Sequence, residues 1–489
     1  MRNTIIKLKS IELENFKNVE QGKIEFKEDK TNNTISNILG IYGQNGSGKT
    51  SIINALYLLK LATCGQELGP KVYNFIASKE DSAVLNFEFR MFNEDEEYKV
   101  FYKFEIRKVE KYKDNYMNPM NEIENHMDYN MKSLTYNNKK EDTVEISKEK
   151  LSYSKLENNQ WKNRVTIIDY DVDYTDYAFR PIKNYREVAN TTDKKVALGI
   201  AKGLSQENST SYIFIPKSFS LLVQSFGKTN VDNSKIISGI RNFGTFNLFV
   251  IQNDDLCAIN SNVIMPFTYM IKNDKGGIRG NIPVKLFDTS VIEIDRYETM
   301  EKILSQINVV ISTIVPKLNI EIKNYGKETL KNGIEGYKVE LLSTRGENSI
   351  PLKYESDGIK KIISILSVLI AMYNNENVIV AIDELDAGVF EYLLGEILEI
   401  ISKGAKGQLI FTSHNLRALE KLNKDLVVFT TTNPRNRYIS LSNVKGTNNL
   451  RDFYYRGLIL GGQKEELYDE TNKYEMSHAF RKAWMMNND

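Results

Sequence analysis

The stretch Ile38-Leu-Gly-Ile-Tyr42, continued by Gly43-Gln-Asn-Gly-Ser-Gly-Lys-Thr50, decides the fold of this chain. Its first part is a short apolar run that predicts a buried strand. Residues 49–61 then place apolar side chains on one face and predict a helix. The loop between them matches the pattern G-x-x-x-x-G-K-[ST] of a phosphate-binding loop (P-loop), in the strand–loop–helix context that this motif requires. The sequence therefore predicts an α/β protein that binds nucleotide.

The residue types in this loop suit phosphate chemistry. Glycines at 43, 46 and 48 let backbone N–H groups turn inward around phosphate oxygens. Lys49 supplies a positive charge to the outer phosphates, and the Thr50 hydroxyl can ligate Mg²⁺. A glycine-rich structural turn is the alternative interpretation. We predict ATP and Mg²⁺ as ligands, with nucleotide contacts from Gly43, Gln44, Asn45, Gly46, Ser47, Gly48, Lys49, Thr50 and Ser51.

Two acids follow a second apolar run, Val378-Ile-Val-Ala-Ile382. We predict that Asp383 holds Mg²⁺ and that Glu384 polarises the water that attacks the γ-phosphate. A strand over 408–412 ends before Ser413-His414-Asn415, where His414 can contact the γ-phosphate or that water. An ordinary strand-end turn and helix cap is the alternative for each of these sites.

A further candidate anion site lies at Tyr354-Glu-Ser-Asp-Gly358, just before a predicted helix over 359–373. Ser356, Gly358 and the start of that helix can bind phosphate, because the backbone N–H groups there are free to donate. A plain Ser/Asp helix cap is the commoner fate of such residues. Strands and helices alternate through this half of the chain, which is typical of an α/β layer with parallel strands.

Composition narrows the class of protein. The chain has 489 residues, with 65 Lys and Arg against 64 Asp and Glu, so its net charge is only +1. This balance excludes a globally basic nucleic-acid coat but leaves a local basic groove open. Two cysteines, Cys64 and Cys257, form no disulfide framework, and no signal or membrane-spanning segment is apparent. A cytoplasmic location without membrane contact is therefore expected.

The sequence predicts three parts: an N-terminal lobe over 1–110, an insertion over 111–290 and a C-terminal lobe over 291–489. Residues 110–164 are rich in Asn, Lys, Glu, Tyr and Met, and parts of this segment are expected to be mobile. No sustained heptads occur, so no long coiled coil is predicted.

The motifs occur in the order of an ABC-type ATPase head. The P-loop, Ser356-Asp-Gly358, Asp383-Glu384 and Ser413-His414 resemble the Walker A motif, the signature, the Walker B motif and the switch histidine. Lys49 and Asp383 are 383 − 49 = 334 residues apart. Such a separation resembles the split heads of SMC, RecF and overcoming-lysogenization-defect ATPases, and it implies a split head with a large mixed α+β insertion.

Longer runs extend the resemblance. Ile11-Glu-Leu-Glu-Asn-Phe16-Lys17 resembles the first strand of those heads, and IDELDAGVFEYLLGE (382–396) resembles stand-alone ATPases of bacterial phage-defence and abortive-infection systems. The resemblance implies an ATP-hydrolysing homodimer that controls a separate effector, a nuclease or a toxin. ATP would lie between Lys49 of one protomer and Ser356 of the other. A RecF- or SMC-like DNA-maintenance ATPase and a slow nucleotide-gated scaffold are the alternative functions.

Several residues remain open. The signature is Ser-Asp-Gly and not the Ser-Gly-Gly of transporters, the role of Asp386 is uncertain, and Gln66 is a guess for the Q-loop glutamine. For Arg435 and Arg437, a solvated turn is favoured over a contact with phosphate, nucleic acid or a partner. A set of basic and aromatic residues could line a nucleic-acid groove, although a charged helix surface is favoured: Lys183, Tyr185, Arg186, Lys194, Lys195 and Lys202.

Overall fold

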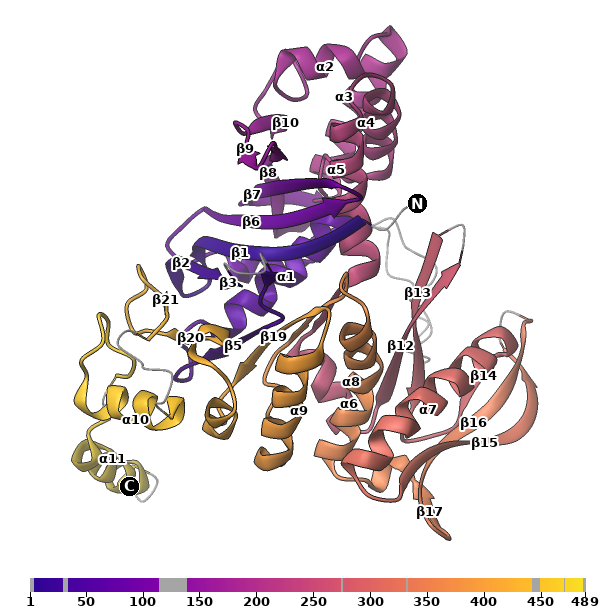
Figure 1. Ribbon diagram of the computed structural model, residues 1–489, viewed down its shortest axis with the longest axis vertical. Helices are drawn as coiled ribbons and strands as arrows, with labels where there is room; N and C mark the ends of the chain where they lie inside the picture. The colour runs from indigo at the N-terminus through magenta and orange to yellow at the C-terminus, as the bar shows by residue number, and fades with distance from the viewer. Residues whose placement is uncertain are drawn as a thin grey trace.

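A computed structural model describes residues 4–29, 34–113, 139–273, 276–330, 333–441, 449–469 and 471–486. In this part of the chain, an antiparallel sheet, the helix α1 (Lys49–Cys64), a mostly parallel sheet and a layer of helices are stacked on one another (Figure 1). The P-loop lies between the two sheets at the start of α1.

The mostly parallel sheet carries the candidate site. Its strand order is β11-β18-β19-β5-β20-β21, and only the β20–β21 pair is antiparallel. The strands are β5 (Ile38–Tyr42), β11 (Leu248–Ile251), β18 (Ile379–Ile382), β19 (Gln408–Ser413), β20 (Val427–Thr430) and β21 (Tyr438–Ile439). Because β5 inserts between β19 and β20, two segments from opposite ends of the chain complete one sheet.

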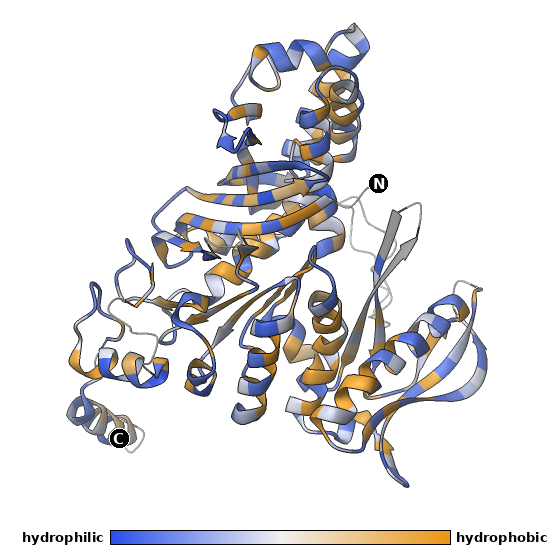
Figure 2. Cartoon of the chain, viewed as in Figure 1, coloured by the Kyte–Doolittle hydropathy of each residue, from blue (hydrophilic) through white to orange (hydrophobic). Residues whose placement is uncertain are grey.

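The antiparallel sheet covers the other side of α1. Its order is β10-β8-β7-β6-β1-β2, with β9 paired to β8. The strands are β1 (Thr4–Phe16), β2 (Val19–Glu25), β6 (Ser82–Asn93), β7 (Glu96–Lys113), β8 (Lys139–Glu157), β9 (Gln160–Trp161) and β10 (Val165–Asp171). Alternate residues point inward, so hydrophobic and hydrophilic colours alternate along β1 and β6 (Figure 2). A two-stranded sheet pairs β3 (Glu28–Asp29) with β4 (Thr34–Ile35).

Apolar burial holds these layers together. Ile52, Ile53 and Leu56 of α1 are fully buried in one cluster with inward residues of the antiparallel sheet. On the opposite face of the parallel sheet, a second cluster buries α8 (Asp357–Asn374) and α9 (Glu391–Gly404). The parallel strands are therefore covered on both faces, as their continuous apolar runs require.

The remaining elements surround this core. Four helices adjoin the antiparallel sheet, and a helix with small sheets adjoins α8 (Figure 1). They are α2 (Ile182–Val188), α3 (Thr192–Glu207), α4 (Pro216–Thr229), α5 (Val231–Asn242), α6 (Asn253–Asn260), β12 (Ile264–Asn273), β13 (Gly276–Lys285), β14 (Ser290–Glu293), α7 (Ile294–Ile314), β15 (Leu318–Thr329), β16 (Glu335–Arg345), β17 (Asn348–Pro351), α10 (Leu450–Leu460) and α11 (Lys473–Met485). Short helices are η1 (Pro70–Phe75), η2 (Phe243–Asn247), η3 (Leu352–Tyr354), η4 (Leu416–Glu420) and η5 (Lys424–Leu426).

The predicted fold class is confirmed: the protein is mixed α/β, its P-loop sheet is split across the chain, and its described helices form no long coiled coil. The expectation of mobility in residues 110–164 missed β8, whose apolar alternation is interrupted by buried polar side chains such as Ser147, Glu149 and Ser152. The three-part division stays a prediction. β7 runs across residue 110, and β11, from the predicted insertion, pairs with β18.

Candidate nucleotide-binding site

The P-loop leaves the carboxyl end of β5 and enters α1, as predicted. Its glycines have positive φ angles: 152° at Gly43, 74° at Gly46 and 95° at Gly48. A Cβ atom on Gly43 would lie 1.7 Å from the Thr430 hydroxyl, so no larger residue fits there. These positions allow the loop to curl with its N–H groups inward, as anion binding requires.

Lys49 is buried at the centre of the loop. Its Nζ donates to the carbonyl oxygens of Gly43 at 2.9 Å and Gln44 at 2.8 Å. Burial lowers its pKa to about 8, and the nearby carboxylates of Asp383, Glu384 and Asp386 oppose that shift. The cation is therefore partly stripped of water and ready to exchange carbonyl partners for phosphate oxygens.

The donors expected for Mg²⁺ lie together although they are far apart in sequence. The Thr50 hydroxyl lies 3.3 Å from Asp383 Oδ1, and the Thr412 hydroxyl donates to the same oxygen at 2.6 Å. Asp383 is 2% exposed. A hydroxyl and one buried carboxylate fit Mg²⁺, which uses one or two protein carboxylates beside phosphate and water ligands.

Glu384 has an unusual backbone. Its φ is 47°, in the left-handed region that non-glycine residues rarely adopt. Its N–H donates to the Thr412 hydroxyl at 2.7 Å, and its carbonyl oxygen accepts from Lys361 Nζ. Such strain costs of order 1–3 kcal/mol and persists where surrounding contacts enforce it. The half-buried side chain has no hydrogen-bond partner among the described residues, so its carboxylate is available to a ligand or a water.

Asp386 organises the segment that carries His414. Its Oδ2 accepts from the backbone N–H of His414 at 3.0 Å and of Asn415 at 2.9 Å. His414 is exposed as a whole residue, but partial burial of its ring, and then the charge of Lys49, lower its pKa. The shift favours the neutral imidazole near Lys49, and Asp386 positions the backbone of this segment, a role that the sequence left uncertain.

Ser356 and Gly358 open α8, where the sequence placed them. Ser356 is exposed, and its hydroxyl accepts from Ile359 N at 3.4 Å as a helix cap. A Cβ on Gly358 would lie 1.9 Å from the Gly388 carbonyl oxygen, so glycine lets α8 approach the segment after Glu384. Within the described chain, no hydrogen bond links Ser356 or Gly358 to the P-loop.

Comparison with known families agrees with this geometry. Residues 6–417 match the model of the AAA ATPase domain. The chain belongs to this family. No curated protein sequence matches the chain.

Solved structures similar to this AAA ATPase include two SMC heads and one RecF. An SMC head bound to the C-terminal winged-helix domain of ScpA has a TM-score of 0.41 and 11% identity, covering 89% of this chain and 98% of that one. The SMC head from Thermotoga maritima has a TM-score of 0.35 and 14% identity, with 90% and 100% covered. The recombination mediator RecF with ATP has a TM-score of 0.34 and 13% identity, with 84% and 94% covered.

The structure also places the remaining predicted residues of this ATPase. Asn45 and Gly46 are exposed at the tip of the loop. The Ser51 hydroxyl donates to Asn18 Oδ1 at 3.2 Å, and Asn18 Nδ2 in turn donates to the carbonyl oxygen of Gly46 in the loop. Gln66 is exposed beyond the end of α1, which at ~1.5 Å per residue is ~24 Å from the P-loop. The guess that Gln66 is the Q-loop glutamine is therefore wrong.

Sequence reasoning missed Gln252. This residue directly follows β11, and the carbonyl oxygen of Ile251 accepts from Asp383 N at 3.0 Å. Gln252 Nε2 donates to Asn54 Oδ1 at 2.7 Å, one turn after Thr50 on α1. No local motif marks Gln252, because its place depends on the pairing of β11 with β18.

The solvated turn expected for Arg435 and Arg437 is confirmed for Arg435 and wrong for Arg437. Arg435 is exposed and pairs with Glu20 at 2.9 Å. Arg437 is 7% exposed and donates to the carbonyl oxygens of Thr431 at 2.6 Å and Asn18 at 2.7 Å, so it braces the P-loop wall.

The basic residues predicted to form a charged helix surface lie on α2 and α3. The methionines of residues 117–131 lie outside the described residues.

The low pKa of Lys49 predicts proton uptake on nucleotide binding. At pH 7 the ammonium is mostly charged, whereas at pH 9 most of it is neutral, since its pKa is about 8. Phosphate charges favour the ammonium and raise its pKa, so we expect binding to take up almost no proton at pH 7 and close to one proton per site at pH 9. Calorimetry in two buffers of different ionisation enthalpy measures this number. An uptake that persists in Lys49→Arg would assign the proton to another group.

Proposed function

We propose that the protein binds ATP with Mg²⁺ and hydrolyses it in a homodimer. The observation that carries this proposal is the meeting of the P-loop and Asp383: the Thr50 hydroxyl lies 3.3 Å from a carboxylate 333 residues further along the chain. Thr50 and Asp383 would hold Mg²⁺, which neutralises phosphate charge when bound. The predicted roles of Lys49, Glu384 and His414 agree with their position around that point.

Each residue then has one task. Lys49 exchanges its two carbonyl partners for β- and γ-phosphate oxygens. Glu384 accepts a proton from the attacking water, whose approach is in line with the leaving oxygen. His414, held neutral, donates a hydrogen bond toward the γ-phosphate, and Asp386 positions it through its backbone. Gln252 follows Ile251, which is hydrogen-bonded to Asp383, and it would contact the water or the metal once its amide leaves Asn54 and Lys71.

The second half of each site is proposed to come from the partner protomer. Ser356 is exposed at the N-terminus of α8 and has no link to its own P-loop. In a head-to-head dimer this N-terminus would donate hydrogen bonds to the γ-phosphate across the interface. Each protomer would therefore contribute Lys49 to one site and Ser356 to the other.

A bulky residue at the cap tests this arrangement. We expect Ser356→Arg to bind the first nucleotide normally but to lose ATP-dependent dimerisation and most turnover, because the side chain blocks the close approach. Light scattering with ATP and a phosphate-release assay measure both effects. Normal dimerisation and turnover would make the cap purely structural.

Mixing Ser356→Arg with Lys49→Ala protein sharpens that test. A mixed dimer has one composite site with Lys49 and Ser356 intact and one site with both parts lost. We expect ATP-dependent heterodimers, with partial activity if one site can fire alone. No heterodimer under any ATP concentration would contradict the shared-site arrangement.

We further propose that this ATPase is the sensor or motor subunit of an anti-phage system and controls a separate effector. Its support is the resemblance of the C-terminal motifs, together with large exposed apolar side chains on α11, Met476, Phe480 and Trp484, which suit a protein partner. Plaque assays with wild type and Lys49→Ala in the native gene neighbourhood test it. Equal plaque counts would contradict the defence role.

Among the described residues, no helix combines the length and apolarity needed to span a membrane.

A further inference from the structure

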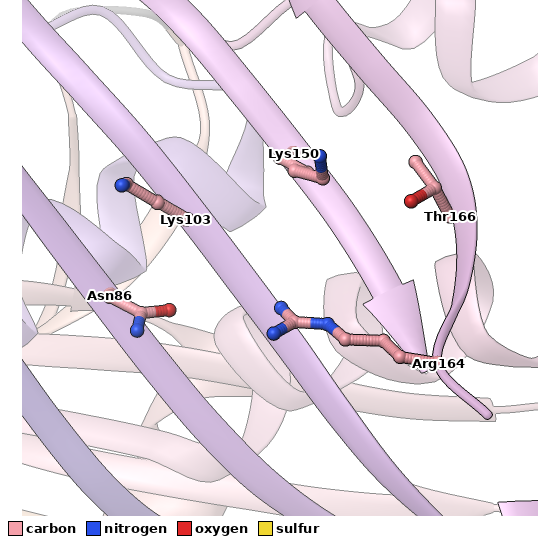
Figure 3. Close-up of a pocket in the computed structure, with 5 residues that line it drawn as sticks. All are labelled: Asn86, Lys103, Lys150, Arg164 and Thr166. Atoms are coloured by element: carbon pink, nitrogen blue, oxygen red, sulfur yellow. The ribbon is translucent and has the colours of Figure 1, made fainter. Parts of the chain in front are cut away.

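The outer face of the antiparallel sheet carries a cationic pocket far from the P-loop in sequence. Its volume is about 410 Å³, and it is lined by Asn86 of β6, Lys103 of β7, Lys150 of β8, Thr166 of β10 and Arg164, which directly precedes β10. The strands lie in sequential register here, since Asn86 is opposite Lys103 and Lys103 is opposite Lys150. Figure 3 shows these side chains on one face, with the Arg164 guanidinium extending toward Asn86. Three cations and no carboxylate line this pocket.

The opposition of Lys103 and Lys150 is unfavourable in the free protein. Directly opposite residues on antiparallel strands have Cβ atoms ~4.5–5.5 Å apart, and like charges there are destabilising. The charge of Lys150 is compensated by an ion pair with Asp169, at 2.9 Å between Nζ and Oδ2. Lys103 has no ion pair or hydrogen bond within the described chain. An anion between the two strands would convert this repulsion into attraction.

Arg164 is held in place to complete the pocket. Its Nε donates to the Ser152 hydroxyl at 2.8 Å, and its guanidinium carbon lies 3.8 Å from the centre of the Phe101 ring. These contacts leave the terminal N–H groups for a ligand. Burial lowers the pKa of Arg164, and the charge of Glu88 opposes that shift, so the guanidinium has lost part of its hydration.

The pocket is also lined by two uncharged polar residues, Asn86 and Thr166. The Thr166 hydroxyl can donate or accept. Asn86 donates to Glu12 Oε2 at 3.2 Å, whereas its own Oδ1 is buried without a partner in the described structure. The pocket therefore offers charged donors for a multiply charged anion and an acceptor for a ligand hydroxyl. Three carboxylates interact with these lining residues: Asp169 pairs with Lys150, Glu12 accepts from Asn86, and the charge of Glu88 acts on Arg164.

We propose that this sheet face binds a phosphate-bearing ligand, with Lys103, Lys150 and Arg164 as the anion contacts. A phosphate group carries about −1.5 to −2 charges when terminal and has several acceptor oxygens, so it suits three cations that line one pocket better than a singly charged carboxylate ligand does. The phosphate can belong to a free small molecule or to the backbone of a single nucleic-acid strand, because the pocket opens on the sheet surface. This site is separate from the proposed ATP site and does not depend on it.

Binding is measured in a Lys49→Ala background, so that the P-loop does not compete. The probes are inorganic phosphate by calorimetry and a fluorescein-labelled oligothymidylate by anisotropy. We expect the added pair Lys103→Gln and Arg164→Gln to weaken binding by about tenfold or more, since two charge-assisted contacts are lost. If the strand is the ligand, its salt slope should fall by about 1.4, or ~0.7 for each phosphate contact.

The matched control pair is Arg296→Gln and Lys338→Gln, which removes the same charge from α7 and β16. Both side chains are about half exposed, 52% and 44%, and both make surface ion pairs. Phosphate binding without tighter oligonucleotide binding identifies a free ligand, and much tighter oligonucleotide binding identifies a strand. If the Lys49→Ala protein binds neither probe, or if the pocket variant binds like the control, the proposal is overturned. Should the double variant unfold, Lys103→Glu alone serves, because the Lys103 side chain makes no hydrogen bond or ion pair within the described chain.

Discussion

Lys49→Ala is expected to abolish nucleotide binding in the accessible concentration range. Lys49 is the cation of the loop, and its ammonium donates two hydrogen bonds to the carbonyl oxygens of Gly43 and Gln44, which we propose it exchanges for phosphate oxygens. Charge-assisted hydrogen bonds contribute ~1.5–3 kcal/mol each, so losing two of them weakens binding by at least ~100-fold. Calorimetry with a non-hydrolysable ATP analogue measures the loss.

Lys60→Ala is the matched control for this variant. Lys60 lies on the same helix, ~16 Å further along at ~1.5 Å per residue, and burial also lowers its pKa to about 8. It should bind nucleotide like wild type. Thermal unfolding of both variants separates lost binding from lost folding. Unchanged affinity in folded Lys49→Ala would remove the P-loop assignment.

Glu384→Gln is expected to bind ATP and to hydrolyse it about 10²–10⁴-fold more slowly. The amide keeps the size of the side chain and cannot take a proton from the water. The backbone contacts at this position use the main-chain N–H and carbonyl oxygen, so the exchange should preserve the unusual φ of Glu384. ATP should therefore accumulate on the protein and stabilise its dimer. Single-turnover phosphate release and size-exclusion chromatography with ATP measure both effects.

Glu396→Gln makes the same exchange on the exposed face of α9 and should leave turnover unchanged. The comparison isolates the position from the loss of one charge. If Glu384→Gln turns over at the wild-type rate, another group must act as the base. Fast turnover together with a stable ATP dimer would separate dimerisation from the chemical step.

Much of the site was predictable because its motifs are local. The P-loop needs only adjacent residues: an apolar strand, glycines at 43, 46 and 48, and a helix that starts at Lys49. The strand–acid pattern before Asp383 and the helix cap at Ser356 are local in the same sense. These elements start within two residues of their expected bounds, and α1 ends three residues later than expected, since apolar periodicity and capping depend on neighbouring positions.

Residues that belong to no local sequence pattern were not predicted. Gln252 lies near Asp383 because β11 pairs in parallel with β18, although these two strands are more than 120 residues apart in the sequence. Arg437 was expected in a solvated turn, yet that turn folds over the P-loop and its guanidinium becomes buried. β8 was missed because several of its buried positions carry polar side chains, among them Glu149, which accepts from the Tyr102 hydroxyl at 2.6 Å, so the apolar alternation is interrupted.

The sequence by itself determined the nucleotide-binding chemistry, because the phosphate loop, the paired acids and the helix cap each depend on neighbouring residues. Only the tertiary structure decided which of them meet. β5 inserts between β19 and β20, so the carboxyl ends of parallel strands bring Thr50 to Asp383 across the whole chain. The register of β6, β7 and β8 likewise aligns Asn86, Lys103 and Lys150 in one row. Strand pairing buries apolar surface and satisfies backbone hydrogen bonds over long separations, and no local run of residues specifies that outcome.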